Sequence, residues 1–224
     1  MELSIDTAGD WASIALSEEG HLKAELTWHC PRTHSVELLP TVETLLARTN
    51  AAKDDITAVF VCKGPGGYAG LRAGMSTAKG LAYALNVPLV GVGRLEIEAY
   101  QHAAYPSAVC AVHRAGRGQI AWALYRGPTA EWRELIGPRM AAPEAMLDEL
   151  PEGSLLCGEV SEELAALVAS ARKKLSVASP AASLRRAGFL AELGWRRLAD
   201  GQVDDAKTLV PLYLREPAIG PQSQ

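Results

Sequence analysis

A glycine-rich segment between a strand pattern and a helix pattern limits most strongly what this chain can fold into. Residues 64–74 (GPGGYAGLRAG) follow the apolar run 57–62 and precede apolar residues at helical spacing over 71–85. Glycine lacks a side chain and accepts positive φ, so the backbone can approach another group closely there. The segment is either an anion seat built from free N–H groups or a tight turn packed on a neighbouring part of the fold. The local pattern favours the turn.

A positively charged residue, Arg72, stands at the start of the expected helix. A cation in the first helical turn opposes the helix dipole, so Arg72 is expected to have an anionic partner, either a carboxylate or a ligand. The segment does not carry the Gly-Lys-Ser/Thr ending of a P-loop, and it lacks a usable Rossmann spacing. Neither of these common nucleotide-binding loops is therefore predicted.

Composition excludes several broad classes. The net charge of −4 and the pI near 5.8 give no basic surface overall, so unaided binding to nucleic acid is not expected. No apolar run approaches the ~18 residues of a membrane span, and the N-terminus has a strand pattern rather than a signal pattern. These features predict a soluble cytoplasmic protein that does not associate with membranes. The cysteines form no Cys-x-x-Cys pair, which favours buried thiols.

The order of strand and helix patterns predicts an α/β fold with two similar halves. Three strands, a helix, a strand and a helix fill residues 1–105, and the order returns imperfectly over 106–224. The last helix, at about 182–200, and the tail are expected to pack back on the first half. Antiparallel strands followed by parallel ones with crossover helices give a mixed sheet. Two such βββαβα subdomains are the layout of the duplicated ribonuclease-H-like (actin and sugar-kinase, ASKHA) fold, whose ligand cleft lies between the halves.

Motifs along the chain resemble those of one family. They are LSIDT at 3–7, HSVELLP at 34–40, the glycine segment through Arg72, AKGLA at 78–82 and PLYLR at 211–215. In order and spacing the chain resembles the TsaB (YeaZ) family, the partner subunits of TsaD in threonylcarbamoyladenosine modification of tRNA. Residues 67–69 (GYA) replace the Ser-Phe-Thr usual in the family, and 112–114 (VHR) lack its aspartate-arginine pair. These departures argue against a catalytic role for either segment.

The resemblance implies a non-catalytic subunit that scaffolds and activates a TsaD-like catalytic subunit. Their complex would transfer a threonylcarbamoyl group to N6 of the adenosine at position 37 of ANN-decoding tRNAs. It would recruit a TsaE-like ATPase, and tRNA would be bound only through the complex. ATP or ADP would lie at the complex interface, with no cofactor bound tightly by this chain. Alone, the chain would form a homodimer.

Two other functions are weaker alternatives. TsaD-like subunits carry His-x-x-x-His on the first helix, where imidazoles at i and i+4 can share a metal. Here Leu38 stands at that spacing after His34, and no His-Glu-x-x-His occurs. A bound metal and a glycopeptidase-like metalloprotease activity are therefore not expected. A small ATP-dependent kinase of the same fold would need a phosphate loop in the second half and a catalytic base, and the sequence offers neither.

Asp6 is the candidate for a remnant of a nucleotide site. In the actin and sugar-kinase layout, an aspartate that ends the first strand can hold a nucleotide-bound magnesium. The favoured alternative is that Asp6 and Thr7 satisfy backbone groups of a turn, with Asp6 paired to Arg72 or Lys63. The candidate nucleotide or anion contacts are Asp6, Thr7, Gly64, Gly66, Gly70 and Arg72.

Two helices are predicted to form the partner interface. Residues 35–47 are apolar on more than one side, and residues 71–85 are rich in small side chains that let another helix approach. The resemblance implies that a TsaD-like subunit or a second copy docks here, with Gly74, Ala78 and Ala82 facing outward. Ordinary packing on the chain's own sheet is the alternative. The predicted interface residues are Leu39, Val42, Leu46, Leu71, Gly74, Met75, Ala78 and Ala82.

Overall fold

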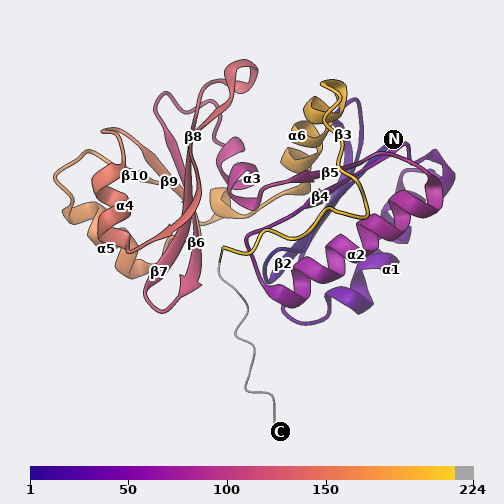
Figure 1. Ribbon diagram of the computed structural model, residues 1–224, viewed down its shortest axis with the longest axis horizontal. Coiled ribbons are helices and arrows are strands. Elements are labelled where there is room, and N and C mark those ends of the chain that lie inside the picture. The colour runs from indigo at the N-terminus through magenta and orange to yellow at the C-terminus, as the bar shows by residue number, and fades with distance from the viewer. Residues whose placement is uncertain (215–224) are drawn as a thin grey trace, which may run out of the picture.

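Two mixed sheets form the framework of the computed structural model, which describes residues 1–214 (Figure 1). The first sheet has the strand order β3-β2-β1-β4-β5, in which β1, β2 and β3 pair antiparallel and β1, β4 and β5 pair parallel. Its strands are β1 (Glu2–Asp6), β2 (Trp11–Glu18), β3 (His21–His29), β4 (Ala58–Cys62) and β5 (Leu89–Val92). Helices α1 (His34–Arg48) and α2 (Tyr68–Leu85) cover one face, and α6 (Ala187–Ala199) covers the other.

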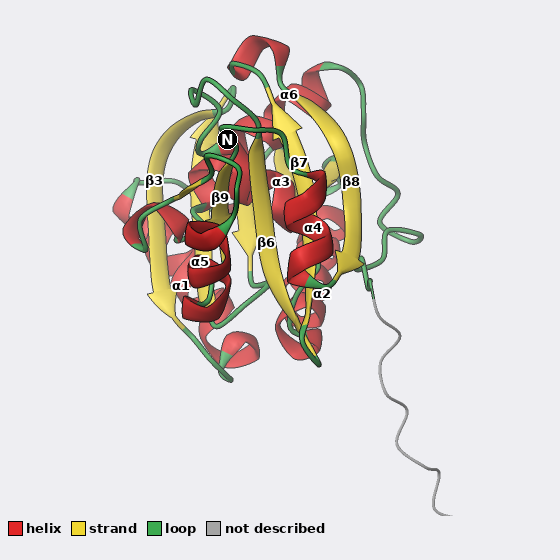
Figure 2. Ribbon diagram, turned by 90° about the vertical axis from the view of Figure 1, so that its left-hand side faces the viewer, coloured by secondary structure: helices red, strands yellow, loops and turns green. Residues whose placement is uncertain are grey.

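The second sheet repeats this order as β10-β9-β6-β7-β8, so β6 to β10 take the places of β1 to β5. Its strands are β6 (Val109–Gly116), β7 (Gln119–Arg126), β8 (Arg133–Ala141), β9 (Leu155–Gly158) and β10 (Ser176–Val177). Helices α4 (Pro143–Glu149) and α5 (Glu162–Ser170) cover its outer face (Figure 2). Short 3-10 turns lie at Lys53–Asp55, Thr129–Glu131 and Ala181–Ser183. The common strand order confirms the predicted duplicated α/β fold.

Helix α3 (Arg94–Tyr100) lies between the two sheets and is buried on both sides. Leu95 and Ala99 pack against the inner face of the second sheet. Ile97 and Tyr100 pack in the cluster formed by β4, β5 and α6. A continuous apolar core therefore joins the two halves through α3.

The helix predicted over 182–200 is shorter in the structure. It begins at Ala187, because the backbone at Leu184 and Arg186 is extended, with ψ angles of 120° and 133°. The extended segment allows Arg185, which is buried, to reach the acidic groups between the two halves. The rest of the expected helix packs on the first sheet as α6.

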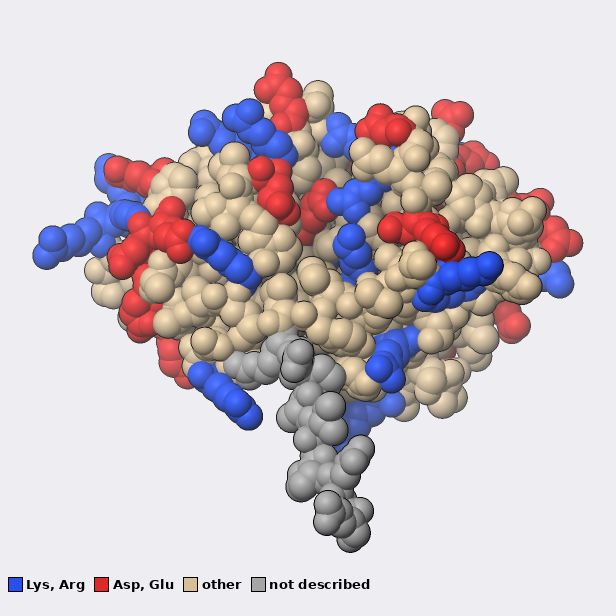
Figure 3. All heavy atoms as spheres, viewed as in Figure 1, with Lys and Arg blue, Asp and Glu red and all other residues tan. Residues whose placement is uncertain are grey.

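The outer surface mixes charges of both signs. On the face shown in Figure 3, Lys and Arg side chains are dispersed among Asp and Glu over both halves. Within residues 1–214, no helix has both the length and the apolar character needed to cross a bilayer. The cysteines are free and buried, as the sequence predicted.

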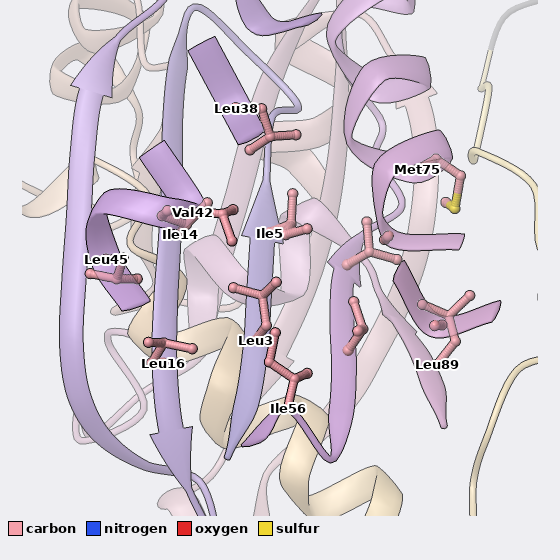
Figure 4. Packing of buried hydrophobic residues seen from close by; sticks show 14 of the residues in the cluster. Leu3, Ile5, Ile14, Leu16, Leu38, Val42, Leu45, Ile56, Met75 and Leu89 are labelled. Atoms are coloured by element: carbon pink, nitrogen blue, oxygen red, sulfur yellow. The ribbon is translucent and has the colours of Figure 1, made fainter. Parts of the chain in front are cut away.

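The main core of the first half lies between the sheet and α1 and α2. Side chains of β1 and β2 such as Leu3, Ile5 and Ile14 point toward Leu38 and Val42 of α1 (Figure 4). Since both helices press their apolar residues onto the sheet, this packing uses most of the apolar surface that the sequence assigned to a partner.

The prediction that Gly74, Ala78 and Ala82 face outward is wrong, because this row packs on the chain's own sheet. A β-carbon on Gly74 would lie 2.2 Å from Thr7 Oγ1, so small residues are needed to bring α2 close to the end of β1. Only Leu39 among the predicted interface residues is largely exposed, at 49%. The others are buried within the chain: Val42, Leu46, Leu71, Gly74, Met75, Ala78 and Ala82.

Candidate functional site

A cleft of about 660 Å³ lies between the two halves. The turn that joins β1 to β2 forms one wall, together with the first turns of α1 and α2. Arg94 and Glu98 of α3, Arg185, and His113 and Glu159 of the second half also line the cleft. Charged groups from both halves therefore meet at one place, which makes this cleft the candidate site.

Two buried arginines organise the acidic groups of the first half. Arg185 Nε donates to Asp6 Oδ2 at 2.9 Å, and Arg185 Nη1 donates to Glu98 Oε1 at 3.2 Å. Arg94 Nε donates to the same Glu98 oxygen at 2.9 Å, since the two residues are one helical turn apart on α3. Arg94 Nη1 also donates to the carbonyl oxygen of Ala8 at 3.2 Å. Two carboxylates of the first half are thus neutralised by arginines of the same chain.

The pairing continues into the second half through Glu159. Arg94 Nη2 donates to Glu159 Oε1 at 2.5 Å, and the other oxygen of Glu159 lies 2.9 Å from His113 Nδ1. The backbone N–H of Arg114 donates to that second oxygen at 3.0 Å. We call this set the charge ladder; its members are Asp6, Arg185, Glu98, Arg94, Glu159 and His113.

The ladder favours the charged forms of two of its members, Arg185 and Glu159. Burial alone would lower the pKa of Arg185, but the charges of Asp6 and Glu98 outweigh it and raise that pKa above its usual value. Burial alone would raise the pKa of Glu159, but the hydrogen bond from His113 and the charge of Arg94 hold that pKa well below its usual range. Arg185 and Glu159 therefore stay ionised at neutral pH.

The glycine segment forms the tight turn that the local pattern favoured. A β-carbon on Gly66 would lie 2.0 Å from the carbonyl oxygen of Ala8, and one on Gly70 would lie 2.3 Å from that of Thr7. Thr7 Oγ1 donates to the carbonyl oxygen of Gly70 at 2.7 Å, and the N–H of Gly67 donates to that of Ala8 at 3.1 Å. The glycines thus allow α2 to begin in contact with the turn after β1.

Asp6 has a different partner from those predicted. It pairs with Arg185 rather than with Arg72 or Lys63, and its other oxygen accepts the N–H of Ala8 at 2.9 Å, which is the turn role expected of it. Arg72 is exposed, and its partners among residues 1–214 are aromatic side chains rather than an anion. Its guanidinium lies 4.0 Å from the centre of the Tyr68 ring, and its Nε donates to the Tyr213 hydroxyl at 3.5 Å.

The structure separates the candidate nucleotide or anion contacts. Thr7 and Gly70 line the cleft, and Asp6 lies beneath it, fully buried. Gly64, Gly66 and Arg72 are not among the lining residues. The six residues therefore do not form one site.

His34 has a structural partner in the cleft wall. Its Nε2 lies 3.0 Å from the carbonyl oxygen of Gly9, and Leu38 is buried in the core one turn later. Across residues 1–214, no group of three or more His, Cys, Asp or Glu side chains is arranged to hold a metal.

Sequence reasoning missed most of the charge ladder. Arg94 and Glu98 carried a usable signal, since they lie four residues apart in a helix pattern and so predict an ion pair on one helix face. No local pattern indicated Arg185, whose partner Asp6 is 179 positions away. Glu159 and His113 likewise meet across a separation of 46 positions.

The repeated mixed sheets and the cleft between them define a duplicated α/β protein of the actin and sugar-kinase class. Residues 29–219 match the family described as TsaD: tRNA N6-adenosine threonylcarbamoyltransferase. The chain belongs to the TsaB (YeaZ) family, whose members carry the name tRNA threonylcarbamoyladenosine biosynthesis protein.

Some relatives match about half of the chain, and others match nearly all of it. The TsaB protein of Bacillus subtilis is 36% identical over 124 residues, which is 55% of this chain and 54% of that protein, so the match spans about half of each. The TsaB protein of Haemophilus influenzae is 26% identical over 95% of this chain and 92% of its own length. The solved structure of YeaZ from Pseudomonas aeruginosa has the same fold, with a TM-score of 0.82 at 24% identity over 95% of this chain and 99% of that one.

Proposed function

We propose that this chain is a non-catalytic subunit that supports a TsaD-like catalytic subunit. Together they would transfer a threonylcarbamoyl group to N6 of the adenosine at position 37 of ANN-decoding tRNAs. The observation that carries this proposal is the charge ladder. Asp6, Glu98 and Glu159 are each paired with cations of the chain itself, so their charges are balanced within the chain, as expected of a subunit that does not carry out the reaction itself.

The outer faces of α1 and α2 are the proposed docking surface for the TsaD-like subunit. Four large apolar or aromatic side chains of these two helices are exposed: Val36 at 71%, Leu39 at 49%, Tyr68 at 44% and Tyr83 at 83%. Exposed apolar groups on neighbouring helices are typical of protein interfaces. This surface replaces the buried row of α2 as the partner interface, and in the absence of the partner a second copy would dock on it.

The charge distribution supports binding of tRNA through the complex only. The chain carries a net charge of −4, and the Lys and Arg side chains visible in Figure 3 are dispersed among acidic residues. Binding to phosphate backbones requires several clustered cations, which a partner would have to supply. The TsaE-like ATPase and a nucleotide at the complex interface belong to the same proposal and rest on the family alone.

Leu39→Glu tests the docking surface. Because Leu39 is half exposed, the variant should remain folded, but a carboxylate in an apolar contact should weaken binding to the TsaD-like subunit by tenfold or more. Binding is measured by calorimetry, and modified adenosine in tRNA by mass spectrometry.

Leu135→Glu is the matched control, since Leu135 is 41% exposed on β8 in the other half and should retain full binding. If a folded Leu39→Glu variant bound as tightly as the control and supported the same level of tRNA modification, the proposed surface would be wrong.

A further inference from the structure

The class to which this fold belongs raises the question of a metal-bound nucleotide at the end of β1. Asp6 is the residue that would hold the metal, but both of its oxygens are already engaged, one of them by a cation. Oδ1 accepts the N–H of Ala8 at 2.9 Å, and Oδ2 accepts from Arg185 Nε at 2.9 Å. The side chain is also fully buried. Mg²⁺ requires carboxylate oxygens that face a space large enough for its remaining waters and phosphate ligands. The residues present therefore do not fit a magnesium nucleotide.

Arginine side chains occupy that space instead. The guanidinium of Arg185 lies between Asp6 and Glu98, and that of Arg94 lies between Glu98 and Glu159. Arg94 also contacts the carbonyl oxygen of Ala8 in the turn after β1, so it links that turn to the second half. A guanidinium stays charged and presents several donors in one plane, which suits it to bridge carboxylates permanently.

We propose that Arg185 and Arg94 are built-in cations that take the place of a metal-bound nucleotide at the floor of the cleft, and that this chain alone binds no magnesium nucleotide there. Displacing Arg185 would leave Asp6 as a buried carboxylate without a cation and would remove one of the two arginines paired with Glu98, which is strongly unfavourable. The apolar core around α3 keeps the halves together, so the cleft floor cannot be reached by separating them.

The first test titrates the full chain with Mg-ADP and with Mg-ATP by calorimetry, and follows thermal unfolding at the same concentrations. We expect no saturable heat up to millimolar nucleotide and no rise in melting temperature. Saturable binding that is lost in Asp6→Asn would overturn the proposal. A nucleotide site that needs the TsaD-like subunit is separate, because the chain is tested alone, and this inference does not depend on the proposed function.

The second test removes the built-in cation. In Arg185→Gln, Asp6 Oδ2 and Glu98 Oε1 both lose the guanidinium that links them, and Glu98 Oε2 has no hydrogen-bond partner among the described residues. Two adjacent carboxylates are ligands for a hard divalent cation. We expect this variant to bind Mn²⁺, followed by electron paramagnetic resonance, with Mg²⁺ as competitor, and we expect Asp6→Asn in the same background to abolish the binding.

Neighbouring residues supply the controls. Arg186→Gln removes the next arginine in the chain, which is exposed and pairs with Glu25, and it should gain no Mn²⁺ site. Arg185→Lys keeps a cation in place and should gain none either. If Arg185→Gln unfolds, recovery of the folded state on addition of Mn²⁺ or Mg²⁺ supports the proposal, and failure to recover overturns it. A folded Arg185→Gln that binds no Mn²⁺ overturns it as well.

Discussion

Gly74 and Gly80 lie on the same helix, but a β-carbon would have opposite effects at the two positions. At Gly74 it would meet Thr7 Oγ1 at 2.2 Å, whereas at Gly80 it would meet no atom within 4 Å. Glycine within a helix costs up to about 1 kcal/mol relative to alanine. We expect Gly80→Ala to raise the free energy of unfolding by up to ~1 kcal/mol and Gly74→Ala to lower it by ~1–3 kcal/mol, from strain against Thr7.

Urea unfolding of the two variants measures both changes. Each variant controls for the other, since both add the same methyl group to α2. Changes of the same sign would contradict the packing described for this helix.

At the residue scale, the sequence predicts chemistry only where partners are close along the chain. The turn role of Asp6 follows from its neighbours, and its N–H contact from Ala8 agrees with it. The ionic partner of Asp6 could not be predicted in this way. Arg185 comes from a segment that the sequence pattern predicted to be helical but whose backbone is extended. The sequence indicated a tight turn at the glycine segment, but not that the segment packs against Thr7 and Ala8 in the turn after β1.

Helix α4 ends against a lysine from a distant part of the second half. Lys173 Nζ donates to the carbonyl oxygens of Leu147, Asp148 and Leu150 at 3.1, 2.5 and 2.8 Å. These carbonyls carry the negative end of the helix dipole, where the last turn of a helix has too few backbone N–H donors of its own. We expect Lys173→Met to lower the free energy of unfolding by about 1–2 kcal/mol, because the carbonyls lose a charged donor.

The adjacent Lys174 provides the control for this prediction. Its side chain is exposed, so Lys174→Met should change stability by less than about 0.5 kcal/mol. Urea unfolding gives the totals, and hydrogen exchange at the end of α4 should rise in Lys173→Met alone. Equal effects of the two substitutions would assign no stabilising role to the contacts of Lys173.

At the element scale, the periodicity of the sequence predicted the helices and strands themselves better than it predicted which side of each helix is buried. The strands and helices of the first half follow one another in the predicted order. Helices α1 and α2 fall within a few residues of their predicted ranges. Their orientation was not predictable, because both helices carry apolar or small residues on more than one side. Burial of Ala78 and exposure of Val36 were decided by the sheet that each helix covers.

At the scale of the whole molecule, Glu159 makes the free energy of unfolding depend on pH in the acidic range. The depressed pKa of Glu159 means that its contribution to stability is present above the pKa of an unfolded glutamate, near 4.3, and is lost as the pH falls below it. We expect Glu159→Gln to lower the free energy of unfolding at pH 7 by about 1–2 kcal/mol, a modest value because the side chain is 37% exposed and partly screened by water. The variant should also lose less stability than the parent between pH 5 and pH 3.

Glu149→Gln is the control at this scale, because Glu149 pairs with Arg139 within the second half and both are exposed. Chemical unfolding at several pH values compares the two variants with the parent. If Glu149→Gln and Glu159→Gln showed the same pH profile, the link between the halves would contribute nothing specific to stability in acid.

The position of α3 also bears on how a duplicated chain can be divided. A helix of seven residues is too short to be stable in water by itself, so α3 depends on the surfaces that cover it. Cutting the chain after the first repeat would uncover Leu95 and Ala99, and it would also separate β4 and β5 from α6, which comes from the end of the chain. The two repeats are thus copies in architecture but a single cooperative folding unit, and neither copy contains all the parts of its own core.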